Sequence, residues 1–147
     1  MADNPPAGMP RIVPYVFYED VDGALDWLTR AFGFVEQLRY TEDDGSVSHA
    51  EMRFSDGVLM LGDPGSSYEN PRHQGHLHGS LLVYVDDVDD HCATAKAAGA
   101  EVIDEPADKP YGDRMYSVLD PEGQRWDFCQ HVRDVRPEDW GAKVAEP

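Results

Sequence analysis

The chain has 147 residues, the size of one ordinary domain, which is long enough to bury a core and too short for two independent ones. Its 29 Asp and Glu against 12 Lys and Arg give a formal net charge of -17. This charge disfavours nucleic acid and anionic membrane surfaces and favours cationic partners, although acidity also serves solubility alone. The N-terminus has no basic segment followed by an apolar run, as a secretory signal would have, and no apolar run is long enough to span a bilayer. We therefore expect a cytoplasmic protein.

The first predicted unit begins at Tyr15 with "YVFYEDVDGALDWLTRAFGFVE". An alternating strand is followed by acidic residues and then by apolar residues at helical spacing, and Gly33 closes the helix. The apolar positions of this helix are Val21, Ala24, Leu25, Leu28 and Phe32. Extended segments follow, including the hairpin "SHAEMRFSDGVLML" with Gly57 in its turn.

The next segment, "GDPGSSYENPRHQGHLHG", is rich in Gly, Pro, Ser and Asn and is typical of a connection between modules. It contains His73, His76 and His78, and the last two would share one face of an extended segment. Two interpretations stay open, a local metal site and a polar connection with solvated histidines.

The second unit, "LVYVDDVDDHCATAKAAGAEVI" from Leu82, repeats the first with an offset of 82 - 15 = 67. Its helix has Val88, Cys92, Ala95 and Ala98 at helical spacing and ends at Gly99, and its hairpin "RMYSVLDPEGQRWDFCQ" turns at Gly123. We therefore predict an α+β fold in which the unit βαβββ is used twice. The predicted single domain comprises module one at about 11–63, a connection at 64–78, module two at about 79–131 and a polar tail at 132–147, where Pro137 argues against a continuous helix.

Cys92 and Cys129 match no zinc spacing, and neither lies in a pattern that marks a nucleophile. We expect both to be small buried hydrophobic side chains in a reducing compartment.

Two βαβββ modules with "VDDVDD" opening the second helix, "AAGAEV" closing it and "DPEGQRWDF" ending the second sheet resemble the vicinal oxygen chelate superfamily, glyoxalase/bleomycin-resistance type. The resemblance covers roughly Arg11 to His131. It implies two curved mixed sheets that pair around a cleft, and a homodimer in solution. It also implies a small-molecule ligand, because some members sequester antibiotics without a metal.

In metal-dependent members of this family, two pairs of His or Glu hold a divalent ion, with one ligand on the first strand and one on the last strand of each module. The resemblance places these positions at Val13, Leu61, Ser80 and Asp127. Valine and leucine cannot bind a divalent ion, so we predict no metal and no cofactor. Asp127 is then a lone carboxylate whose role depends on its neighbours.

If these four positions face the cleft, strand alternation adds Tyr15, Phe17, Leu59, Leu82, Tyr84, Arg125 and Cys129, and turns Val16, Val83, Trp126 and Phe128 toward the helices. In "HAEMRF" the apolar residues should face the helix and leave His49, Glu51 and Arg53 on the other side. The candidate ligand-binding residues are therefore Tyr15, Phe17, His49, Glu51, Arg53, Tyr84, Arg125 and Asp127. Plain alternatives stay open: an exposed sheet face, an Arg125–Asp127 ion pair, and aromatic residues that only pack.

Two functional hypotheses follow. The first is a metal-independent protein that sequesters a small aromatic or cationic molecule such as an antibiotic, held by aromatic side chains and carboxylates. The second is an enzyme of the superfamily, either a lyase, isomerase or dioxygenase with an unusual metal site, or a metal-free catalyst that uses His49, Glu51 or Asp127 as an acid or base. The residues at the metal positions favour binding.

Overall fold

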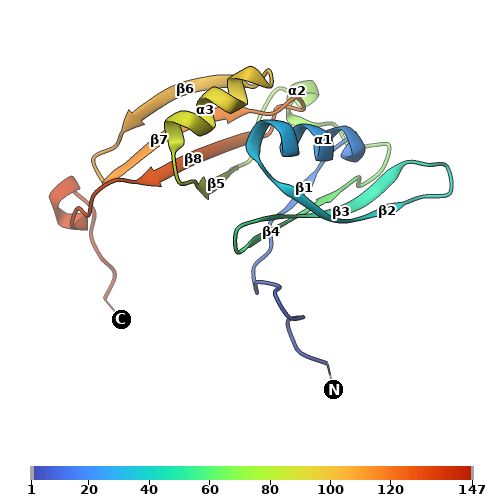
Figure 1. The fold of residues 1–147 in the computed structure, drawn as a ribbon, viewed down its shortest axis with the longest axis horizontal. Helices are drawn as coiled ribbons and strands as arrows, with labels where there is room; N and C mark the ends of the chain where they lie inside the picture. Colours follow the sequence, from blue (N-terminus) through green and yellow to red (C-terminus); the bar gives the residue numbers. More distant parts are fainter. Residues whose placement is uncertain (1, 147) are drawn as a thin grey trace. The chain divides into compact units, whose positions relative to one another are not determined.

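The computed structural model describes residues 2–146, and these residues divide into two compact units. Unit 1 comprises residues 2–77 together with Pro121–Gln124, and unit 2 comprises His78–Asp120 and residues 125–146. Each unit contains one four-stranded mixed sheet with a helix across one face (Figure 1). The predicted α+β class and the repeated βαβββ unit are confirmed.

Unit 1 contains β1 (Tyr15–Phe17), α1 (Val21–Phe32), β2 (Val35–Thr41), β3 (Val47–Phe54), β4 (Gly57–Gly62) and the short helix α2 (Pro71–Gln74). The strand order is β1-β4-β3-β2, with β1 parallel to β4 and the other neighbours antiparallel. Helix α2 lies in the segment that the sequence predicted as a connection.

Helix α1 forms because its termini are capped and one of its faces is apolar. The Asp20 side chain accepts a hydrogen bond from the Gly23 amide, and Gly33 ends the helix in the left-handed conformation at φ 84°. The helix packs against the sheet with seven buried side chains: Val21, Ala24, Leu25, Trp27, Leu28, Ala31 and Phe32. Opposite them lie buried residues of the strands, Val16, Ala50, Met52, Leu59 and Leu61.

The turn Pro121–Gln124 belongs to unit 1 because it holds the start of α1. The Glu122 carboxylate accepts hydrogen bonds from the backbone amides of Glu19 and Asp20, at 2.7 and 2.9 Å. These are amides next to a helix N-terminus, where a carboxylate is favoured. The Gln124 side chain donates to the carbonyl of Phe17, which ties the turn to β1 as well.

Unit 2 contains β5 (Ser80–Tyr84), α3 (Val88–Ala97), β6 (Glu101–Asp108), β7 (Asp113–Leu119), β8 (Arg125–His131) and a 3₁₀ turn η1 (Pro137–Trp140). The strand order is β5-β8-β7-β6, again with one parallel pair, β5 and β8. Helix α3 buries only Val88, Cys92 and Ala95, against large buried strand residues, Tyr116, Val118, Trp126 and Phe128. Figure 1 shows α3 across the β5–β8 sheet.

Two predicted strand orientations are wrong. Leu59 and Leu61 were expected on the face away from the helix, but both are buried, and Leu61 pairs with Val16 and Ala50 on the α1 side of the sheet. The hairpin turns differ in length: Phe54 pairs with Gly57 in the first, whereas Leu119 pairs with Arg125 in the second. Counting four residues from the turn glycine therefore reaches opposite faces of the two sheets.

Both cysteines are buried and free, in agreement with the sequence. Among the described residues, no helix is both long enough and apolar enough to cross a membrane.

Candidate functional site

The face of the first sheet that lies away from α1 carries five of the predicted site residues. In register, Tyr15 neighbours Met60, which neighbours Glu51, and Phe17 neighbours Gly62, which neighbours His49. Paired residues point to the same side of a sheet, so one surface gathers side chains from all four strands. We call it the aromatic face: Tyr15, Phe17, Leu38, Tyr40, His49, Glu51, Arg53, Met60 and, packed against Phe17, Tyr68.

The large apolar side chains of the aromatic face are open to solvent. Tyr15 is 49% exposed, Phe17 46%, Leu38 43% and Tyr40 59%. The ring centroids of Phe17 lie 5.9 Å from those of both Tyr15 and Tyr68, in edge-to-face contact. Clustered exposed rings of this kind mark ligand or partner surfaces more often than plain packing, which would bury them.

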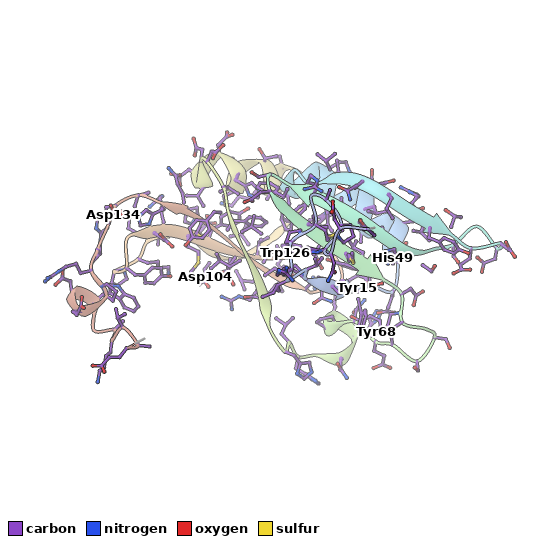
Figure 2. The ribbon with its side chains drawn as sticks, turned by 90° about the horizontal axis from the view of Figure 1, so that it is seen from below. Tyr15, His49, Tyr68, Asp104, Trp126 and Asp134 are labelled. Carbon is purple, nitrogen blue, oxygen red and sulfur yellow. The ribbon has the colours of Figure 1, made fainter. Side chains whose placement is uncertain are left out.

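Tyr15 occupies its position because Gly62 has no side chain. A Cβ atom at Gly62 would lie 2.6 Å from Cε1 of the Tyr15 ring. With that space free, the Tyr15 hydroxyl reaches Nδ1 of His49 at 2.7 Å. Figure 2 shows Tyr15 and His49 next to each other, with Tyr68 nearby.

A chain of polar side chains continues from His49 along the sheet. Nε2 of His49 lies 3.7 Å from Oε2 of Glu51, and the other oxygen of Glu51 accepts a hydrogen bond from Gln37 at 3.1 Å. The Gln37 oxygen in turn accepts from Nε of Arg53 at 2.9 Å. His49, Glu51 and Arg53 therefore face away from the helix as predicted, and the sheet connects them through Gln37.

Sequence reasoning missed Gln37. The register of β2 against β3 shifts between Glu36 and Leu38, so Gln37 is an extra residue in the ladder, and it reaches the side chains of Glu51 and Arg53. Strict alternation along β2 contains no signal for such a bulge.

The corresponding face of the second sheet carries Tyr84, Arg125 and Asp127, and it is a hydrogen-bonded surface. Asp127 pairs in register with Leu82 and Ser117, on the side opposite the buried Trp126 and Phe128. One carboxylate oxygen accepts from the Ser80 hydroxyl at 2.7 Å, and the other accepts from Ser117 and from Nη2 of Arg125 at 3.1 Å. Both oxygens of Asp127 are thus occupied.

Two opposing effects act on the pKa of Asp127. Burial raises it, while the hydrogen bonds from Ser117, Ser80 and Arg125 and the positive charge of Arg125 lower it by more. The pKa lies below the ordinary aspartate value, so Asp127 is a charge already balanced by its neighbours. The predicted alternative of an Arg125–Asp127 ion pair is confirmed.

A second polar chain lies on the same sheet. The Tyr84 hydroxyl donates to Asp113 at 3.1 Å, Nδ1 of His131 lies 2.7 Å from the other Asp113 oxygen, and its Nε2 lies 2.7 Å from Asp134. Hydrogen bonds to these two carboxylates raise the pKa of His131. Burial raises the pKa of Cys129, which lies under Tyr84, to about 11, so this thiol is inert near neutral pH.

The residues at the family's metal positions do not fit a divalent ion. In register, the first-module counterpart of Asp127 is Met60, since Leu82 pairs with Asp127 as Tyr15 pairs with Met60. Val13, Met60 and Ser80 supply no good ligand, and Asp127 is engaged by three neighbours. Across residues 2–146, no three His, Cys, Asp or Glu side chains are grouped to hold a metal. His73 of the predicted histidine tract lies 2.7 Å from a Glu19 oxygen.

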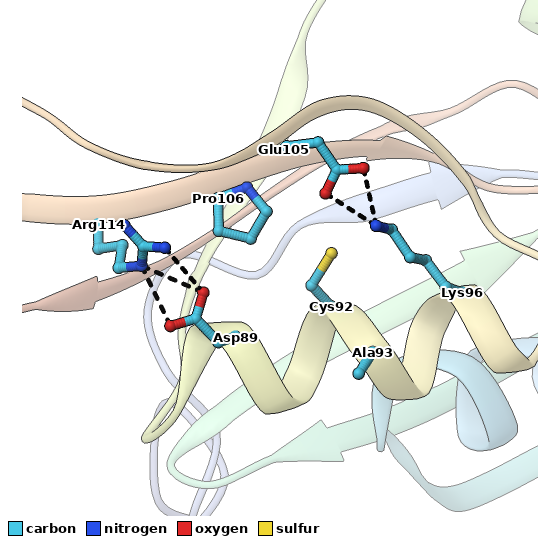
Figure 3. A pocket seen from close by; sticks show the side chains of 7 residues that line it. All are labelled: Asp89, Cys92, Ala93, Lys96, Glu105, Pro106 and Arg114. Atoms are coloured by element: carbon cyan, nitrogen blue, oxygen red, sulfur yellow. Dashed lines mark hydrogen bonds and ion pairs between the residues drawn. The ribbon is translucent and has the colours of Figure 1, made fainter.

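A crevice of about 300 Å³ lies in unit 2 between α3 and β6 (Figure 3). Its charged side chains are paired, Lys96 with Glu105 and Arg114 with Asp89. Burial raises the pKa of the Cys92 thiol at its floor. The crevice therefore has the character of a surface groove lined by paired charges, and the aromatic face, with its exposed rings, is the stronger candidate for a ligand site.

Comparisons with known proteins give the relationship. The model of the Glyoxalase/Bleomycin resistance protein/Dioxygenase superfamily matches residues 8–128. An uncharacterized protein of Mycobacterium bovis is 32% identical over 141 residues, covering 92% of this chain and 93% of that protein. A candidate glyoxylase of the same organism, CFP32, is 36% identical over 92 residues, which is 58% of this chain and 35% of that protein.

Two examples show the similarity to solved structures. The crystal structure of TioX from Micromonospora sp. ML1 shares 37% identity, with a TM-score of 0.70 over 84% of this chain and 99% of that chain. A family enzyme from Burkholderia phytofirmans shares the fold at 19% identity, with a TM-score of 0.61 over 82% of this chain and 97% of that one. With its repeated βαβββ units, this chain belongs to the Glyoxalase/Bleomycin resistance protein/Dioxygenase superfamily.

Proposed function

We propose that the protein is a metal-independent small-molecule binding protein whose ligand is a flat aromatic compound held on the aromatic face of unit 1. The observation that carries the proposal is the group of solvent-exposed rings on one sheet face, where Phe17 contacts both Tyr15 and Tyr68. A flat ligand would cover these rings and recover the apolar area that they now expose.

The charge around the aromatic face favours a cationic ligand. The Glu51 side chain is only 13% exposed and lies beside the rings, and the chain as a whole carries a net charge of -17. A cation over an aromatic ring and near a partly buried carboxylate gains from both. Antibiotics of the bleomycin type, which the superfamily is named for, are therefore the first ligands to test.

The second set of candidates, Tyr84, Arg125 and Asp127, is the alternative position for the ligand. A ligand there would have to displace hydrogen bonds that already satisfy Asp127, which makes this face the weaker candidate. The proposal also includes a cytoplasmic location, supported by two free and buried thiols, and a symmetric homodimer, the commonest soluble assembly. Light scattering that gives a monomer mass at high micromolar concentration would contradict the homodimer.

Calorimetry with a panel of aromatic cations, bleomycin-type drugs included, tests the proposal. We expect at least one ligand to bind below millimolar concentration, and we expect Phe17→Ala to weaken it by about tenfold or more through the lost ring contacts. Tyr84→Ala is the matched control, because Tyr84 occupies the equivalent position on the second sheet. Equal losses in both variants, or no binding in the panel, would contradict the proposal.

A further inference from the structure

We infer that Tyr15, His49 and Glu51 form a proton relay, through which Tyr15 takes a proton from a bound C–H acid. The inference rests on the proposed small-molecule site and adds acid–base chemistry to it. The observation behind it is a line of three side chains in which a hydroxyl, an imidazole and a carboxylate follow one another on the aromatic face.

The charge of Glu51 favours one tautomer of His49. The Glu51 carboxylate lies 3.7 Å from Nε2, and the Tyr15 hydroxyl lies 2.7 Å from Nδ1. A carboxylate near Nε2 favours the proton on that nitrogen, which leaves the lone pair of Nδ1 to accept a hydrogen bond from the Tyr15 hydroxyl. Tyr15 therefore lies against a base that can receive its proton.

Tyr15 is the exposed end of the relay, and Glu51 is its more buried end. Exposure of the side chain falls from His49, at 31%, to Glu51, at 13%, while Tyr15 is 49% exposed beside the ring of Phe17. The hydrogen bond from Gln37 fixes the carboxylate end. The order is that of a hydroxyl–imidazole–carboxylate triad, with Tyr15 as the group presented to the ligand.

The step balances without a co-reactant for a flat probe such as 5-nitrobenzisoxazole. The Tyr15 oxygen takes the proton on C3 of the probe while the Tyr15 proton passes to Nδ1 of His49. The C–H electron pair forms the third bond of a nitrile, the N–O bond breaks, and 2-cyano-4-nitrophenolate leaves. His49, now an imidazolium beside Glu51, returns its proton through Tyr15 to solvent.

Steady-state kinetics with 5-nitrobenzisoxazole on the full chain test the relay, with product followed by its absorbance. We expect turnover above the buffer background. Tyr15→Phe should lower kcat by about 10²-fold with KM changed less than about twofold, because the ring stays and only the proton-transferring hydroxyl is lost. His49→Gln should also lower kcat more than KM. Tyr111→Phe, which removes a hydroxyl from a ring of unit 2 that packs against Trp140, should leave both constants unchanged.

Binding of 5-nitroindazole, a flat analogue without the N–O bond, separates the two claims. If it binds and the wild-type protein gives no turnover, or if Tyr15→Phe and Tyr111→Phe lose the same fraction of kcat, the relay is overturned and the binding function stands. If neither 5-nitroindazole nor the aromatic cations bind, the proposed function is overturned together with the relay.

Discussion

The two modules share one topology and differ in what their open sheet faces carry. At equivalent register positions, unit 1 has Tyr15 and Met60 where unit 2 has Leu82 and Asp127. Gly62 likewise corresponds to Cys129. In unit 1 a missing side chain lets an aromatic ring lie across the sheet, whereas in unit 2 the equivalent row is filled by a buried thiol and a saturated carboxylate.

This difference separates two uses of the same fold. On the second sheet, the polar groups around Asp127 satisfy one another and contribute to stability, and the exposed apolar side chains include Leu82 and Tyr84, which form no cluster of rings. On the first sheet, exposed rings and a partly buried carboxylate leave apolar area and charge available. We therefore expect substitutions on the second face to change the stability of the fold, and substitutions on the first face to change binding.

The largest effect on stability is expected for Asp127→Ala. It removes the acceptor for Ser80, Ser117 and Arg125, and we expect the free energy of unfolding to fall by about 2–3 kcal/mol. Urea denaturation measures it. The control is Asp139→Ala, because Asp139 is 51% exposed and pairs with Arg136, and such pairs contribute about 0.5 kcal/mol. Similar losses in the two variants would mean that the Asp127 network is an ordinary surface cluster.

Gly62→Ala, unlike Asp127→Ala, should affect ligand binding more than stability. The added Cβ collides with the Tyr15 ring, which is exposed and can rotate away, so we expect a cost of about 1 kcal/mol in stability. Loss of the ring position should weaken ligand binding by about tenfold, or about 1.4 kcal/mol. Calorimetry and denaturation together measure both effects. Gly79→Ala is the matched control, since a Cβ there meets no atom within 4 Å, and equal binding by both variants would rule out a role for the Tyr15 position.

The pH dependence of unfolding should report Asp127. Its pKa is lower in the folded protein than in the unfolded chain, so its contribution is present above the unfolded value of about 3.9 and is lost as pH falls through the folded value. In Asp127→Asn, the free energy of unfolding should decrease less steeply as the pH falls. Urea midpoints between about pH 5 and pH 2 give the slope, and parallel curves for variant and wild type would show that Asp127 is not the group responsible.

The smallest effect is expected at His131, whose side chain is half exposed. Its pKa is raised by Asp134 and Asp113, so its contribution is present below the unfolded value of about 6.5 and is lost as pH rises through the folded value. In His131→Gln, the free energy of unfolding should decrease less steeply as the pH rises. Urea midpoints from about pH 6 to pH 9 test it, and an unchanged slope would show that the His131 contacts add no pH-dependent stability.

The repeat allowed much of the fold to be predicted from the sequence, because each module has the same order of strand, acidic cap, helix and hairpin. The residues around His49 were placed on the correct face since Ala50 and Met52 are buried as their alternation requires. The prediction failed where counting residues along a strand gives the wrong face of the sheet. Because the first turn is shorter, Leu61 lies on the helix side, and the bulge at Gln37 adds an unpredicted side chain to the polar chain.

Side-chain pairing was the other part that the sequence left open. Asp127 was predicted to lie away from the helix, and its register agrees. Its partners Ser80, Ser117 and Arg125 come from three strands, and only the folded sheet shows that they satisfy it together. The space at Gly62 that seats Tyr15 is equally a product of strand pairing, since no motif in the sequence joins these two positions.

We propose that the Glu51 carboxylate, and not that of Asp127, attracts the positive charge of the ligand. Calorimetry of a flat aromatic cation and its neutral isostere, from about 0.05 M to about 0.5 M salt, tests this on the wild type, Glu51→Gln and Asp127→Asn. We predict that the cation binds more tightly, that salt reduces the difference, that Glu51→Gln removes it, and that Asp127→Asn retains it because Arg125 already balances that carboxylate. A preference that survives Glu51→Gln and disappears in Asp127→Asn would contradict the account and move the site to the second sheet.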